Sequence, residues 1–173
     1  YKNLHKSIIR YFHFLYTKAE QGLTMKEVSA WFNFSEVPNN WLGYSLVGNK
    51  GLALGKEYAK FLYENIAFAI NTHGISKSKH IEKVMLLYDG SGKDKISDLT
   101  VNLIKGFLCE YTENFALQYL DERFLEKFPV DKAYFNYETE SFVSKEYCIP
   151  YVLDEKGRKE YVLLTPYDIL RED

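Results

Sequence analysis

The chain has 173 residues, of which 46% are hydrophobic and 27% are charged. This composition excludes a disordered chain and is sufficient for one domain of ordinary size with a sizeable core. The formal net charge of -2 excludes the overall basic field of a nonspecific nucleic-acid binder. No apolar run reaches the length that crosses a membrane, so we expect no membrane partner.

Two helices are predicted at the start of the chain. Apolar residues recur at helical spacing over residues 4–20, and Gly22 ends this amphipathic pattern. Thr24 and Glu27 form a capping box that begins a second helix, which runs to about Phe34. We therefore expect an N-terminal helical hairpin.

The middle of the chain predicts a core helix, a strand and a long helix. The core helix covers residues 56–71, and the strand covers residues 82–88. The long helix begins at Ser97 or Asp98 and reaches roughly Leu120. Its apolar residues at spacings of three and four are Leu99, Leu103, Ile104, Phe107, Leu108, Tyr111 and Phe115.

The last part of the chain has the character of β-structure. Tyr, Phe and Val are frequent in residues 133–137, 141–152 and 160–164, and residues 154–159 join the last two segments as a hairpin turn. The fold class is therefore α+β, with an N-terminal helical hairpin and core helices packed on a mostly antiparallel sheet. We divide the chain into a helical segment, residues 1–47, and a core domain, residues 48–173. Because the chain does not begin with Met and its end resembles a cut, we expect a piece of a longer protein.

The two cysteines, Cys109 in the long helix and Cys148 in a strand, have no CxxC partner. Such residues are typically small buried thiols in a reducing compartment, so we expect a cytoplasmic protein.

A turn with three acidic residues provides the sharpest candidate site. Asp89 follows the strand, Asp94 lies in a Gly-rich turn, and Asp98 lies in the first turn of the long helix. Three carboxylates that converge repel one another unless a divalent cation binds them, which suggests Mg²⁺ or Mn²⁺ and phosphodiester hydrolysis. One of the two lysines of the same turn, Lys93 or Lys95, would contact a phosphate oxygen.

The same residues also have a structural interpretation. Ser97 and Asp98 are good helix caps, and Asp94 can stabilise a turn by bonding its own backbone. In addition, a nuclease core of this type adds an acid-x-lysine motif on a neighbouring strand. Lys145 and Glu146 do not supply that motif. Both interpretations therefore stay open.

Three segments carry a family resemblance: residues 51–55 (GLALG), residues 89–100 (DGSGKDKISDLT) and residues 163–170 (LLTPYDIL). With these segments the chain resembles a group of uncharacterised prokaryotic proteins encoded among mobile-element and phage-defence genes. The resemblance implies a defence context and a further domain beyond the last segment, and it implies no mechanism.

Three functions follow from these observations. The first is a prokaryotic defence-type protein that acts on nucleic acid as a divalent-metal nuclease. The second is a protein-interaction module that binds a partner protein or forms a homo-oligomer, with its aromatic strands as the docking face. The third is a helix-turn-helix DNA-binding regulator that uses residues 23–34. For a nucleic-acid partner, lysines available for a local groove are Lys77, Lys79, Lys83, Lys93, Lys95 and Lys105.

Overall fold

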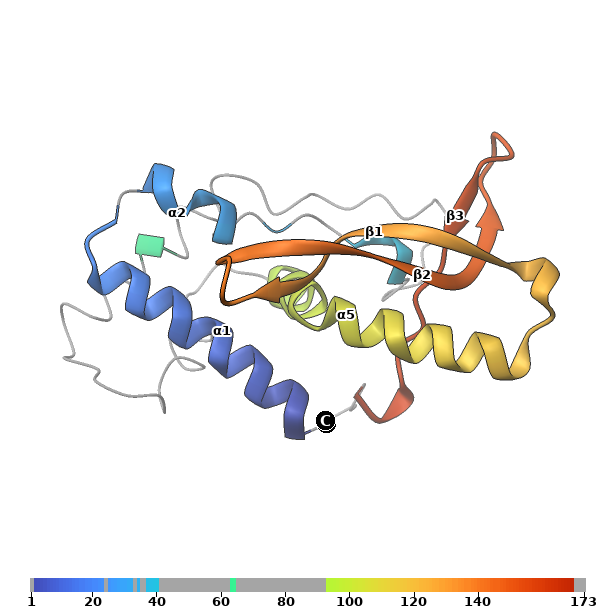
Figure 1. Cartoon of the computed structure of the whole chain (residues 1–173), viewed down its shortest axis with the longest axis horizontal. Coiled ribbons are helices and arrows are strands. Elements are labelled where there is room, and N and C mark those ends of the chain that lie inside the picture. Colours follow the sequence, from blue (N-terminus) through green and yellow to red (C-terminus); the bar gives the residue numbers. More distant parts are fainter. Residues whose placement is uncertain are drawn as a thin grey trace. The chain divides into compact units, whose positions relative to one another are not determined.

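The computed structural model describes residues 2–23, 25–32, 34, 37–40, 63–64 and 93–169. Helices and a three-stranded antiparallel sheet confirm the α+β class (Figure 1). The chain divides into two compact units, one of residues 1–36 and 52–103 and the other of residues 37–51 and 104–173. The boundary expected after residue 47 lies outside the described residues, as do the strand predicted at 82–88 and, apart from the helical residues 63–64, the core helix predicted at 56–71.

The first unit contains the predicted N-terminal helices, α1 (Lys2–Glu20) and α2 (Met25–Phe32). Tyr11 joins them because its hydroxyl donates to the main-chain carbonyl of Trp31. Gly22 ends α1 as predicted. Its φ of 70° is a left-handed conformation that glycine adopts without strain, and its N–H donates to the carbonyl of Ala19 at 3.1 Å.

Helix α5 (Lys93–Tyr119) begins four residues before the predicted start. Ser97 and Asp98 are therefore not its N-terminal caps, and Asp94 lies in the helix rather than in a turn. A cap contributes only about 1 kcal/mol to the stability of a helix, so tertiary packing can make the helix begin at another residue. Lysine is also a good helix former, so Lys93 and Lys95 extend the helix readily.

The sheet has the order β1 (Leu125–Asn136), β2 (Ser141–Leu153) and β3 (Lys159–Tyr161), with antiparallel neighbours. β1 begins eight residues earlier than predicted. Pro129 lies within this strand and pairs with Glu146 of β2. An edge strand tolerates proline because one of its sides needs no ladder hydrogen bonds.

The predicted turn between β2 and β3 is confirmed. The Asp154 carboxylate accepts hydrogen bonds from the main-chain N–H of Lys156 and of Arg158, both at 2.8 Å. These bonds lower the pKa of Asp154, and the bond from the Arg158 main chain contributes most. Gly157, with a φ of 73°, completes the turn.

Helix α5 runs along the β1–β2 hairpin within the second unit (Figure 1). The described part of the chain is completed by three short 3-10 helices, η1 (Pro38–Asn40), η2 (Glu122–Phe124) and η3 (Tyr167–Ile169). The buried core of this unit draws on α5, both long strands and the segment after β3. Its residues are Cys109, Val130, Ala133, Tyr147, Ile149 and Leu163.

Within the described residues, no helix has the length and apolar character that spanning a membrane requires.

Candidate functional site

The predicted acidic site is only partly within the described chain. Asp89 lies outside it, and Asp94 and Asp98 are four residues apart in α5, with side chains outside the described part. The same holds for the side chains of Lys93 and Lys95. The metal site and the nuclease activity therefore stay predictions.

The described residues offer no second metal site. Among them, no three His, Cys, Asp or Glu side chains are grouped so that they could hold a metal ion. Among the described residues, neither Glu64 nor Glu146 therefore belongs to a group that could hold a metal ion. A functional role of the described residues must therefore depend on side chains other than a group of metal ligands.

Lys105 is not available for a nucleic-acid groove. Its side chain is only 5% exposed, and its Nζ donates to the main-chain carbonyl of Asp131 at 2.9 Å. Burial lowers the pKa of Lys105 because the charged ammonium loses its hydration. The lysine holds an irregular part of β1 rather than a ligand.

This irregular part is a β-bulge against α5. The register between β1 and β2 shifts between Val130 and Tyr134, and Lys132 inside the bulge has a φ of 51°. Gly106 lies beside it, and a Cβ on Gly106 would stand 2.8 Å from the carbonyl oxygen of Ala133. Because only glycine allows this approach, Gly106 and Lys105 fix the hairpin on the helix.

The inner side of α5 is closed by packing and hydrogen bonds. Leu108, Cys109, Thr112 and Ala116 are buried. The Thr112 hydroxyl donates to the carbonyl of Leu108 at 2.7 Å and accepts from the N–H of Leu164 at 2.9 Å. Burial raises the pKa of the Cys109 thiol to about 12, so this thiol stays protonated at neutral pH and is no nucleophile.

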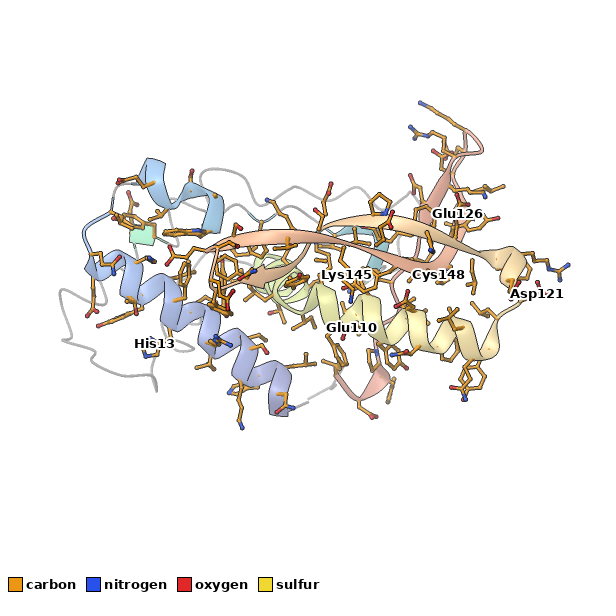
Figure 2. The ribbon with its side chains drawn as sticks, in the orientation of Figure 1. His13, Glu110, Asp121, Glu126, Lys145 and Cys148 are labelled. Carbon is orange, nitrogen blue, oxygen red and sulfur yellow. The ribbon has the colours of Figure 1, made fainter. Side chains whose placement is uncertain are left out.

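Two glutamates tie α5 to β2. Glu110 forms an ion pair with Lys145 at 3.6 Å, in which the side chains are 59% and 48% exposed, and Figure 2 labels the two residues on α5 and β2. Glu113 accepts a hydrogen bond from the main-chain N–H of Cys148 at 2.6 Å. They are the only charged residues in the segment 107–120, so both of its charges are engaged by the sheet.

One flank of the same segment, beside its buried side, carries an aromatic stripe, which we define as Phe107, Tyr111, Phe115 and Tyr119. Tyr111 is 36% exposed, Phe115 is 37% exposed and Tyr119 is 64% exposed. The rings of Phe107 and Tyr111 stack with centroids 6.3 Å apart, and those of Phe115 and Tyr119 lie 4.9 Å apart. Successive members are four residues apart, so they form one row along the helix.

The apolar pattern of the sequence groups Tyr111 and Phe115 with Leu108 of the same helix, and the structure leaves the two aromatic side chains partly exposed. With Thr112 and Ala116 buried, these two aromatic side chains lie at the edge of the buried side, where they are 36% and 37% exposed. A signal was nevertheless present, because a segment of 14 residues with only two charges is unusual for a helix with a solvated face.

A family model matches residues 1–173. The chain belongs to the DUF8370 family. This family is described as a domain of unknown function. No curated protein and no solved structure matches the chain. For this DUF8370 chain, the geometry of the described residues is what indicates a function.

Proposed function

We propose that this chain is a protein-interaction module that docks a partner protein on the aromatic stripe of α5. The observation that carries the proposal is the row of partly exposed rings on the segment 107–120, whose two charged residues, Glu110 and Glu113, both have partners on β2. A helix that stays solvated normally carries charged residues on its outer side. An aromatic row with polar neighbours is instead typical of a surface that another protein covers.

The size of the stripe supports the same function. An aromatic side chain has roughly 200 Å² to bury, so four partly exposed members leave on the order of 300–400 Å² of apolar surface. Patches of a few hundred Å² are about the largest on a typical monomer and are often functional. At about 25 cal/mol per Å², covering the patch would contribute up to roughly 8–10 kcal/mol before the cost of association.

The edges of the sheet are less suited to docking than the helix. β1, one edge strand, carries Pro129, the exposed Lys127 and the bulge, which are features that prevent pairing with another strand. At the other edge, Asn39 covers β3 because its side-chain amide donates to the carbonyl of Tyr161 at 2.9 Å. We therefore place the docking face on the helix, whereas the sequence suggested the aromatic strands.

Site-specific photo-crosslinking in the native cells tests the function. A photoreactive phenylalanine replaces Tyr119, and in a matched control it replaces the exposed His13 of α1. We expect a discrete cross-linked protein, identified by mass spectrometry, from position 119 and none from position 13. The same faint products at both positions, or none at either, would contradict the proposed function.

A further inference from the structure

We infer that the partner on the aromatic stripe is a second copy of this chain, which pairs α5 with α5 about a two-fold axis. This inference rests on the proposed function, since it names the partner for the same surface. Three features carry it: the charge, the spacing and the area of the stripe.

The charge of the stripe favours a copy of itself. Glu110 and Glu113 are held by Lys145 and by the main-chain N–H of Cys148. An acidic partner would find no positive charge on the stripe, and a basic partner would compete with Lys145 for the 59% exposed Glu110, so electrostatic complementarity would add little to the binding of either. Two copies of the stripe, in contrast, would meet without like charges opposite one another.

The spacing of the stripe is self-complementary. Phe115 lies four residues from Tyr111 and four residues from Tyr119, a rise of about 6 Å on either side. A two-fold axis beside Phe115 brings the two Phe115 rings together. In an antiparallel pair it also places Tyr111 opposite the partner's Tyr119. Such an isologous contact uses one surface twice and closes on itself.

The area of the stripe indicates a reversible dimer. With 300–400 Å² of apolar surface from each copy and a polar rim, the pair would bury on the order of 1,000 Å², which is near the lower limit for a specific interface. Interfaces of this size are typical of weak or transient complexes. We therefore expect a dimer that dissociates on dilution through the micromolar range.

A charge-swap experiment on the purified full chain tests the dimer. Sedimentation velocity and light scattering measure the mass of the wild type, of Phe115→Glu and of Phe115→Arg over the micromolar range. We expect each variant to lose dimerisation by at least about tenfold, because like charges then meet at the axis. An equimolar mixture of the two variants should recover the dimer, since glutamate faces arginine.

A matched control and a second pair of variants keep the result clear. Leu117→Glu changes a 60% exposed residue of the same helix, about 200° around the axis from Phe115, and should leave the dimer intact. If circular dichroism shows that the Phe115 variants do not fold, double variants of the two stripe members on either side of Phe115 provide the test. Tyr111→Glu with Tyr119→Arg should dimerise, whereas Tyr111→Glu with Tyr119→Glu should not.

The outcomes separate this inference from the proposed function. A wild type that stays monomeric, or a mixture of Phe115 variants that stays monomeric, overturns the second copy as the partner. If photo-crosslinking at position 119 then still captures one discrete protein of another mass, the docking function stands with a different partner. If position 119 captures none, both are wrong.

Discussion

Helices α1 and α5 bury their inner sides in the same way and differ on their outer sides. In α1, the buried residues are Tyr11, Phe12 and Leu15. The exposed residues of α1 are polar throughout: Asn3, His5, Lys6, Ser7, Arg10, His13, Thr17 and Glu20. In α5, the exposed residues include Tyr111, Phe115, Leu117 and Tyr119.

The difference shows that the fold alone explains the exposed residues of α1 but not those of α5. Burial of one side and hydration of the other fully account for the sequence of α1. The same rule accounts for the inner side of α5 and leaves its aromatic stripe without a reason. Helix α5 is thus the part of the described chain whose sequence points to a further molecule.

The largest expected difference in stability is between two leucine truncations in α5, one of a buried and one of an exposed residue. Leu108 is fully buried, and Leu117 is exposed in the same helix. We expect Leu108→Ala to lower the free energy of unfolding by about 2–5 kcal/mol, because it leaves a cavity. Leu117→Ala should lower it by less than about 0.5 kcal/mol. Urea denaturation measures both, and similar losses would contradict the assignment of inner and outer sides.

Gly106→Ala should produce the next largest effect. The new methyl group would stand 2.8 Å from the carbonyl oxygen of Ala133, so helix and bulge must separate. We expect a loss of about 1–3 kcal/mol in unfolding free energy, although alanine favours a helix by about 1 kcal/mol. Asn114→Ala on the outer side of α5 is the control and should stabilise slightly. A more stable Gly106→Ala variant would show that the hairpin is not fixed at this point.

The helices of this fold were the easiest part to predict from sequence. Apolar residues at helical spacing indicated α1, α2 and the body of α5, because that period persists over several turns. The start of α5 was wrong because Ser97 and Asp98 are good caps, yet capping is a weak preference that tertiary structure overrides. The start of β1 was wrong because the position of Pro129 on a sheet edge depends on pairing with β2, a distant segment.

The candidate surface could be predicted only in part. The low charge of residues 107–120 is visible in the sequence, but which side of the helix is buried is not. Thr112, a polar residue, is buried because its hydroxyl bonds Leu164, which lies 52 residues away in the chain. Which side of the helix is buried, and therefore how exposed Tyr111 and Phe115 are, depends on that long-range contact. The spacing of apolar residues in the sequence does not predict it.

Alkaline pH tests the inner side of α5 through Cys109 and Tyr161. Burial raises the pKa of each to about 12, from 9.0 for the thiol and 10.0 for the phenol. The stability that depends on these two groups being protonated is fully present at pH values below their ordinary pKa values. It is lost as the pH rises towards 12, by at most about 1.4 kcal/mol per pH unit for each group. Lys105 acts in the opposite direction, because its pKa is lowered and stability therefore rises as the pH approaches 10.5.

We expect the unfolding free energy to fall above pH 9, because burial also raises the pKa of Tyr147, so that the groups with a raised pKa outnumber Lys105. The Cys109→Ala variant should show a slope shallower by up to about 1 kcal/mol per pH unit between pH 9 and pH 11. Chemical denaturation at a series of pH values measures both slopes. Equal slopes would mean that the thiol is accessible to water, against its burial beneath the hairpin.

Tyr119→Lys gives the exposed surface of α5 the polar character of the exposed surface of α1, and its effect on folding should be the smallest. The substitution loses part of the ring contact with Phe115, about 0.5 kcal/mol for exposed side chains, and gains a few tenths from the better helix propensity of lysine. The unfolding free energy, measured at a concentration where the chain is monomeric, should therefore change by less than about 0.5 kcal/mol. A loss above about 1.5 kcal/mol would show that the aromatic row serves the fold itself. An unchanged monomer with weakened self-association, in contrast, assigns the row to binding, because a side chain that the fold does not need is then required only when another surface covers it.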